Sequence, residues 1–348
     1  MPLQLSVLDL VPVRTGQTSA DAVAASVALA AIADELGYTR YWFAEHHNMP
    51  AVASTAPPVL IAAVAARTRR IRVGSGGVML PNHAPFTVAE QFATLEAFAP
   101  GRIDLGLGRA PGSDPVITHL LRSSGPTSDV DRFEENIRDI RALAGDGAQL
   151  TLRTADGLRD YEVKATPAAA GIPEVWLLGS SDYSAHLAAK LGLPYVFAHH
   201  FSGEGTERAL DIYRREFVAS ETLAAPRTFL TVNAIVAETV EEAHARALPA
   251  LLNFSRLRTG KPLRPIDTVE DAAAEEQDAL TRQVVDGMLE KWIVDAAEPA
   301  RERIARLAAS FGVDEVMVSP GAGSRAGEPL DRTPGREDTL RLLAPLTS

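Results

Sequence analysis

Short apolar runs alternate with longer segments of helical period along most of this chain. Within each run Val, Ile and Leu follow one another with little polar interruption, which is typical of parallel strands that are covered on both faces. The segments between them repeat Ala and Leu with helical spacing, and two of these segments end at Gly37 and Gly101, as helices commonly do. The runs predict eight strands, over Leu3–Asp9, Arg40–Ala44, Ile71–Gly76, Arg102–Gly108, Glu174–Ser180, Pro194–His200, Phe229–Ala237 and Val313–Ser319.

Eight strands that are each followed by a helix predict an α/β fold of the (β/α)8 TIM-barrel type. A doubly wound sheet is the structural alternative, but it usually has fewer strands. Two intervals exceed the roughly 30 residues of one strand–helix unit. The first follows strand four, where residues 145–170 predict a small hairpin, and the second follows strand seven, at about residues 255–290. We therefore expect one barrel domain over residues 1–348 with two insertions.

The second insertion is rich in proline and then in acidic residues between Pro262 and Asp278. A long segment of this kind inside a compact fold indicates a lid or a mobile loop. A solvated acidic surface helix explains the same composition equally well.

Composition and charge exclude several classes of function. The 348 residues include no cysteine, which excludes disulfides, a thiolate nucleophile and thiolate metal ligands. The formal net charge of −11 argues against nucleic acid or an anionic membrane as a partner. No apolar run reaches membrane-spanning length, and the N-terminus lacks the basic region of a signal peptide. We expect a cytoplasmic enzyme.

Histidines gather where the predicted strands end, which is the end at which barrel enzymes place their active sites. Five of the eight histidines in the chain lie there, namely His46, His47, His83, His199 and His200. Neighbouring side chains on extended backbone point in opposite directions, so an adjacent pair cannot easily bind one metal ion, and we expect no metal site. One histidine of each adjacent pair is expected to be only a hydrogen-bonding residue.

A second candidate site lies at the end of strand five. Ser180 and Ser181 precede an Ala/Leu-rich helix, whose N-terminus readily accepts a phosphate. Plain helix capping by Ser181 or Asp182 is the alternative. Arg109 lies at the end of the neighbouring strand four, and a guanidinium suits bidentate contact with phosphate. Together these residues predict a pocket for a phosphorylated ligand.

Glycines mark two further strand ends. Gly76 and Gly77 are expected where the chain leaves strand three, either to let the backbone approach a flat ligand or to form a plain turn. The segment GLGRAPG, with glycines at Gly106, Gly108 and Gly112, does not have the spacing of a dinucleotide-binding motif.

Several of these segments together resemble the bacterial luciferase-like flavin-dependent monooxygenases. The resemblance is carried by RYWFAEHHN, by RIRVGSGGVMLPNHAPFTVAEQFATLEAFAPGRIDLGLGRAPGSD, by LLGSS and by FGVDEVMV. It implies a barrel that binds FMN at its C-terminal mouth and a mobile loop over the flavin in the Pro262–Asp278 region. One position departs from the light-emitting enzymes, which have a reactive cysteine where this chain has Gly108, so we do not expect light emission.

The resemblance also implies roles for single residues. His46 matches the catalytic histidine, and Glu45 or His47 is expected to orient its loop. Arg109 matches an arginine that contacts the FMN phosphate. Gly76 and Gly77 match a non-prolyl cis peptide beneath the flavin ring. The phosphate-binding turn before the helix is matched by Gly179, Ser180 and Ser181.

These expectations combine into a two-component monooxygenase. A separate flavin reductase would supply reduced FMN, and O2 would oxygenate a small, apolar organic substrate. The family resemblance further implies a homodimer formed through the helices next to strands two and three. Two alternatives remain open: a deazaflavin-dependent dehydrogenase on the same barrel, which would transfer hydride without oxygen, and a flavin-binding protein without catalytic activity.

Overall fold

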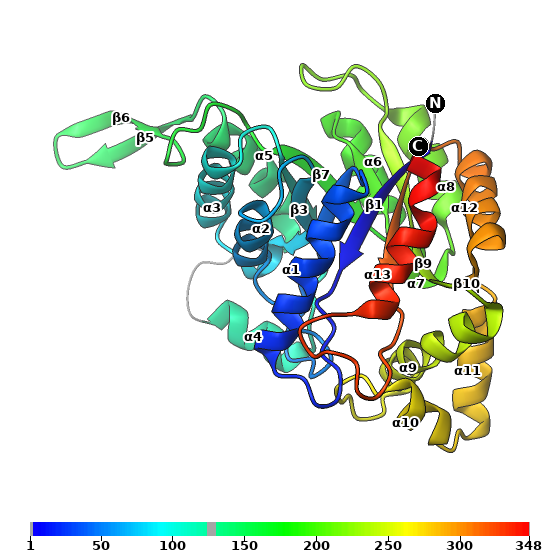
Figure 1. Cartoon of the computed structure of the whole chain (residues 1–348). Coiled ribbons are helices and arrows are strands. Elements are labelled where there is room, and N and C mark those ends of the chain that lie inside the picture. The colour runs from blue at the N-terminus through cyan, green and yellow to red at the C-terminus, as the bar shows by residue number, and fades with distance from the viewer. Residues whose placement is uncertain (1–2, 124–129, 348) are drawn as a thin grey trace.

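Eight parallel strands close into a barrel with helices on its outside (Figure 1). The computed structural model describes residues 3–123 and 130–347. The closure is made where β8 pairs with β9. Around the barrel the strands are β1 (Gln4–Asp9), β2 (Arg40–Phe43), β3 (Arg72–Met79), β4 (Ile103–Gly108), β7 (Glu174–Gly179), β8 (Tyr195–Phe197), β9 (Thr228–Ala237) and β11 (Glu315–Pro320).

All eight expected strands are present, and the predicted barrel is confirmed. Three details differ from the expectation. β3 continues through Gly76 and Gly77 to Met79, so the glycine pair lies inside a strand and not beyond its end. The strand expected over Pro194–His200 stops at Phe197, and the short helix α7 (His199–Ser202) follows. A further strand, β10 (Ile293–Ala296), pairs with β9 at the margin of the barrel.

The outer helices begin and end at recognisable signals. Thr18 and Asp21 form a capping box at the start of α1. Gly192, in the left-handed conformation, ends α6. These helices are α1 (Ser19–Glu35), α2 (Pro57–Ala65), α3 (Pro85–Phe98), α5 (Phe133–Ala144), α6 (Asp182–Leu191), α8 (Thr206–Glu216), α12 (Ala297–Phe311) and α13 (Pro334–Leu343). Single turns of 3-10 helix cover Leu80–Asn82, Val130–Arg132 and Ala344–Thr347.

Aromatic side chains fill the lower interior of the barrel. The ring of Trp42 lies 5.5 Å from that of Trp176 and 5.3 Å from that of Phe229, and all three are buried. Edge contacts of this kind add to the free energy gained by burying the rings. This layer leaves the cavity at the opposite, C-terminal end of the strands.

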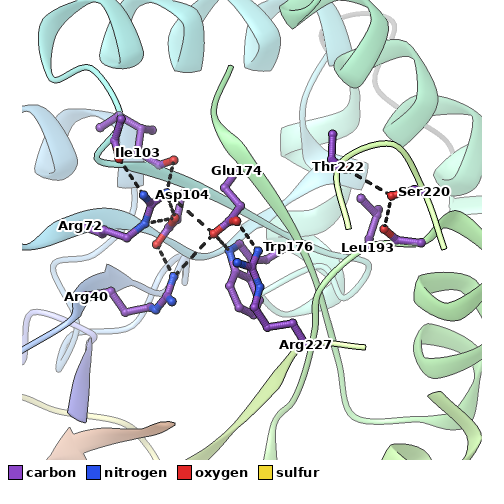
Figure 2. A network of polar contacts seen from close by, with 12 residues as sticks. Arg40, Arg72, Ile103, Asp104, Glu174, Trp176, Leu193, Ser220, Thr222 and Arg227 are labelled. Carbon is purple, nitrogen blue, oxygen red and sulfur yellow. Dashed lines mark hydrogen bonds and ion pairs between the residues drawn. The ribbon is translucent and has the colours of Figure 1, made fainter. Parts of the chain in front are cut away.

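Ion pairs close the barrel below this aromatic layer. Arg40, at the start of β2, contacts Asp104 at 2.9 Å and Glu315 at 2.7 Å, and Arg72 joins Asp104 at 2.5 Å. Figure 2 shows Arg40, Arg72, Asp104 and Glu174 converging from the first or second residues of neighbouring strands. These side chains close the N-terminal end of the barrel, and each buried charge among them has a partner of opposite charge.

Both insertions lie where the sequence placed them. After β4 come α4 (Pro115–Ser123), α5 and an antiparallel hairpin of β5 (Ala148–Thr154) and β6 (Gly157–Val163), which projects away from the barrel (Figure 1). After β9 come α9 (Val240–Thr259), α10 (Val269–Ala274) and α11 (Ala279–Leu289), near the end of the barrel toward which β1 points (Figure 1).

The acidic part of the second insertion contains the short helix α10. Its Val269 and Ala272 are buried. Arg256 of α9 lies 3.1 Å from Asp267, and Arg264 lies 2.8 Å from Glu275. The segment therefore packs on α9 through both apolar contacts and ion pairs. In the described ranges no helix combines the length and the apolar character that crossing a membrane requires.

Candidate functional site

A cavity of about 590 Å³ lies at the C-terminal ends of the barrel strands. Sites for small molecules commonly have volumes of about 300–1,000 Å³. Each residue that the sequence singled out as catalytic or cofactor-binding lines this cavity, although the residues lie in or directly after four different strands. They are His46, Gly76, Gly77, Arg109, Gly179, Ser180 and Ser181.

His46 follows β2 on a loop that the backbone holds firmly. Its own N–H donates to the carbonyl of Ser54 at 3.0 Å, and the N–H of His47 donates to the carbonyl of Gly112 at 3.1 Å. Asn48 turns the chain with a positive φ of 57°. The imidazole Nδ1 of His46 is buried and has no hydrogen-bond partner in the described part of the chain. A partner from a bound molecule would satisfy it.

Glu45 joins this loop to the end of β3. Its carboxylate accepts hydrogen bonds from Nε2 of His47 and Nε2 of His83, both at 2.8 Å, and from the N–H of Met79 at 2.9 Å. Burial alone would raise the pKa of Glu45, but the hydrogen bonds from the two histidines and Met79 lower it to about 2. Glu45 is therefore a permanent carboxylate, and it fixes the position of the loop that carries His46.

The two histidines at the cavity are uncharged imidazoles near neutral pH. Burial lowers the pKa of His46, and the nearby His47 lowers it further, while Glu45 opposes the shift. Burial, with smaller effects of His199 and His46, lowers the pKa of His200 to about 4. A neutral imidazole can accept a proton and give it back once protonated, which suits acid–base work at this wall.

One histidine of each adjacent pair faces the cavity, as the sequence predicted. His46 and His200 line it. Their neighbours find protein partners, because His47 bonds to Glu45 and Nδ1 of His199 lies 2.9 Å from Oγ1 of Thr206.

Arg109 and the start of α6 form the polar end of the cavity. The guanidinium carbon of Arg109 lies 4.1 Å from the centre of the Tyr183 ring, in the first turn of α6. Ser181 is the N-cap residue, but its side chain makes no capping hydrogen bond. Plain capping is therefore not what its hydroxyl does. A cation, a helix N-terminus and free hydroxyls in one place suit an anion such as a phosphate.

The turn before α6 needs glycine at its first position. A Cβ on Gly179 would meet Oγ of Ser184 at 1.8 Å, far inside any permitted contact. The Ser184 hydroxyl donates to the carbonyl of Ser181 at 3.0 Å and so holds the turn in place. Glycine at position 179 is thus a requirement of close packing between β7 and α6.

The glycine pair of β3 forms a flat part of the cavity wall. The peptide bond between Gly76 and Gly77 is cis, as the resemblance implied. A Cβ at Gly76 would lie 2.8 Å from Leu8, and one at Gly77 would lie 2.5 Å from Leu178. Only glycine leaves this wall free of side chains.

Other residues of the cavity were not found from the sequence. Asn253 and Phe254 reach the cavity from α9. Trp292 reaches it from the residues just before β10, and Arg336 reaches it from α13. None of these positions belongs to a recognisable sequence motif, so the sequence did not mark them. The ring centre of Phe254 lies 5.9 Å from that of Trp292, and together they form an apolar wall. Among the described residues, no cluster of three or more His, Cys, Asp or Glu side chains could hold a metal ion.

Comparison with known proteins gives a consistent result over nearly the whole chain. Residues 3–315 match the family model described as luciferase-like monooxygenase. A luciferase-like monooxygenase of Escherichia coli is 38% identical over 320 residues, which cover 91% of each chain. The N-acetyl-S-alkylcysteine monooxygenase of Bacillus subtilis is 35% identical and covers 91% of this chain and 92% of its own.

The same result holds for solved structures. The crystal structure of apo-MsnO8 superposes with a TM-score of 0.84 at 33% identity, and the match covers 99% of this chain and 98% of that one.

Proposed function

Since the chain belongs to the luciferase-like monooxygenase family and is a flavin-dependent monooxygenase, we propose that its flavin is FMN. Reduced FMN, supplied by a separate flavin reductase, would react with O2 at the barrel mouth to oxygenate a small organic substrate. The observation that carries this proposal is one cavity whose wall holds both the buried imidazole of His46 and the anion site of Arg109, Ser180 and Ser181.

The residues of the cavity fit FMN at both of its ends. Arg109, Ser180 and Ser181 would hold the phosphate, and Gly76 with Gly77 would face the flat ring, because neither position carries a side chain. The same fold is found in the oxygenating component of 3,6-diketocamphane monooxygenase in complex with FMN, at 17% identity and a TM-score of 0.70.

Bound reduced FMN would supply two electrons, so that one oxygen atom of O2 enters the substrate and the other leaves as water. The protein contributes three things. His46 accepts a proton at the cavity wall as a neutral imidazole and returns it once it is protonated. Glu45 keeps the loop that carries His46 in position. Apolar side chains such as Phe254 and Trp292 keep water away from the reacting atoms.

The proposed assembly is a homodimer that works in the cytoplasm. Three large apolar side chains on α2 and α3 are exposed: Val59, Phe86 and Phe98. Exposed apolar side chains on these two helices support a contact between two copies. Light scattering on Phe98→Glu, with Leu158→Glu on the projecting hairpin as the control, should give a monomer for the first variant only. If both variants are dimers, the dimer does not form through this surface of α2 and α3.

A deazaflavin-dependent dehydrogenase is the second candidate, because an F420-dependent secondary alcohol dehydrogenase has the same fold at 15% identity and a TM-score of 0.65. Anaerobic titration of the purified protein with reduced FMN and, separately, with reduced F420 distinguishes the two. The proposal predicts binding of reduced FMN and no comparable binding of F420. The opposite preference would assign the chain to hydride transfer without oxygen.

The role of His46 in catalysis is tested with a panel of small thioethers, ketones and aldehydes in the presence of a flavin reductase and NADH. The wild type should form product from at least one of them, and His46→Gln should lose this activity at unchanged FMN affinity. Equal product yields from both proteins would instead remove the role given to His46.

A further inference from the structure

Polar side chains at the ends of β8 and β9 form a wall of the large cavity that the proposed function does not use. Side chains alternate along a strand, so Thr231 and Asn233 of β9 face the barrel interior, as Phe229 of the aromatic layer does, but lie successively nearer to the mouth. His200 lies beside them in α7, just after β8, and lines the same cavity. We call His200, Thr231 and Asn233 the β8/β9 wall.

The hydrogen bonds of Thr231 fix the tautomer of His200. The Thr231 hydroxyl donates to the carbonyl of Phe197 at 3.1 Å, and a hydroxyl has only one hydrogen to donate. Its oxygen must therefore accept the hydrogen bond that joins it to Nδ1 of His200 at 2.9 Å, so Nδ1 carries the proton. Burial lowers the pKa of His200 to about 4, and the ring is neutral near pH 7. Nε2 of His200 is then a hydrogen-bond acceptor.

The amide of Asn233 is fixed in a similar way. Its Nδ2 lies 2.7 Å from the carbonyl oxygen of His200, and only the NH2 group of an amide can donate to a carbonyl. This assigns Oδ1 of Asn233 as the second acceptor of the wall. Neither this oxygen nor Nε2 of His200 has a hydrogen-bond partner among the described residues, and neither is enclosed by protein, in contrast to Nδ1 of His46. Both acceptors are therefore open to the cavity.

Acceptors without donors determine what the wall can bind. A ligand that displaces water from this wall without donating a hydrogen bond leaves the acceptors unpaired, which costs free energy. A ligand with an O–H or N–H group replaces the lost hydrogen bonds. Burial keeps His46 and His200 uncharged, so the same surroundings disfavour a cationic ligand. The apolar wall of Phe254 and Trp292 favours an apolar remainder in the same molecule.

We propose that Nε2 of His200 and Oδ1 of Asn233 bind a neutral O–H or N–H group of the substrate, whose apolar remainder occupies the part of the cavity beside Phe254 and Trp292. This inference rests on the proposed function, since the bound molecule would be the one that is oxygenated near His46. It names the substrate class as small, uncharged molecules with at least one donor group, such as alcohols and amides. His200 and Asn233 are then determinants of substrate specificity.

The test compares two isomers, heptan-1-ol and 1-methoxyhexane, by isothermal titration calorimetry of the full-length protein without flavin. They contain the same atoms, but only the alcohol has a hydrogen to donate. The wild type should bind heptan-1-ol about three- to tenfold more tightly, the ratio expected for one neutral hydrogen bond. His200→Asn should lower this ratio toward one, because asparagine can donate to Thr231 from near the position of Nδ1 but has no atom at the position of Nε2.

His199→Asn is the matched control. Nδ1 of His199 also contacts a threonine hydroxyl, that of Thr206 at 2.9 Å, but the residue does not line the large cavity. This variant should keep the ratio of the wild type. His200→Gln, whose amide oxygen can accept in place of Nε2, should keep most of it, so that the effect follows the acceptor and not the ring. Asn233→Ala, which removes Oδ1, should lower the ratio as His200→Asn does.

Two results would overturn the proposal. Equal affinities of the wild type for the alcohol and the ether would mean that the acceptors of the β8/β9 wall do not meet the ligand. An unchanged ratio in His200→Asn would place the donor of the alcohol elsewhere, and weaker binding of reduced FMN by that variant would then assign His200 to the flavin. Because the titration of the isomers needs no flavin, its failure is separate from a failure to bind reduced FMN.

Discussion

The carboxylate of Glu45 and the imidazole of His83 lie 2.8 Å apart, and this contact ties the end of β2 to the turn after β3. The same carboxylate oxygen accepts from His47, so the residues on both sides of His46 are fixed in place. The sequence EHH can therefore be understood as one residue that faces the cavity between two that position it. This arrangement leads to the first prediction.

Glu45→Gln should loosen the loop that carries His46. It replaces a buried carboxylate that accepts three hydrogen bonds, and hydrogen bonds to charged groups contribute about 1.5–3 kcal/mol. We expect the free energy of unfolding, measured in urea, to fall by about 2–3 kcal/mol. Glu276→Gln, at an exposed position, should change it little. Equal stabilities of the two variants would show that Glu45 does not hold the loop.

His200→Gln should make the stability of the fold less sensitive to acid. The pKa of His200 is about 4 in the folded protein and about 6.5 when unfolded, so the unfolded state binds more protons between these values. Above about pH 6.5 the contribution of His200 to the free energy of unfolding therefore does not depend on pH. As the pH falls from there toward 4, the free energy of unfolding decreases by up to about 3 kcal/mol.

The measurement is the free energy of unfolding of wild type and variant at pH 7 and at pH 5. The difference between the two pH values should be smaller in His200→Gln than in the wild type. The exposed His244→Gln serves as the control and should follow the wild type. An unchanged pH dependence in His200→Gln would mean that the buried imidazole is not what titrates.

Arg109→Met should lower the affinity for reduced FMN about 10- to 100-fold, the range expected for a charged hydrogen bond to phosphate. Tyr183→Leu should have a smaller effect, since the ring only supports the guanidinium at 4.1 Å. Arg159→Met, on the exposed hairpin, is the control for the change in net charge. Undiminished affinity in Arg109→Met would place the flavin phosphate elsewhere.

Arg40→Met should destabilise the protein strongly without changing the site. Asp104 and Glu315 would remain buried without their shared partner, a change that costs about 3–5 kcal/mol in comparable cases. Urea unfolding should show this loss, while the folded variant keeps the affinity of the wild type for reduced FMN. A loss of FMN affinity with unchanged stability would contradict the claim that the ion pairs at the N-terminal end of the barrel stabilise the fold without affecting the site at its C-terminal end.

The barrel could be predicted because parallel strands covered on both faces leave continuous apolar runs, and all eight runs became barrel strands. In β10 the apolar residues Ile293 and Val294 are followed at once by Asp295, so the apolar run is interrupted inside the strand. The strand after Pro194 is shortened because α7 begins at His199. Once the strands are known, so are the residues at their C-terminal ends. Because a barrel brings those ends together, the site residues that lie there could also be predicted.

The remaining residues of the site depend on contacts between distant segments. Arg336 reaches the mouth from α13, and Asn253 reaches it from α9, through helix packing that no local pattern encodes. The pairing of Glu45 with His83 joins residues 38 positions apart. For this reason the sequence indicated that Glu45 or His47 orients the loop but not that His83 takes part.

The central claim is tested most directly by admitting oxygen to the complex with reduced FMN and following the absorbance of oxidised flavin. The account predicts that bound flavin is reoxidised more slowly and in more phases than free reduced FMN, because the cavity controls access of water and protons. His46→Gln should change these phases at unchanged FMN affinity. Reoxidation identical to that of free FMN, in both proteins, would contradict an oxygenase site at this cavity.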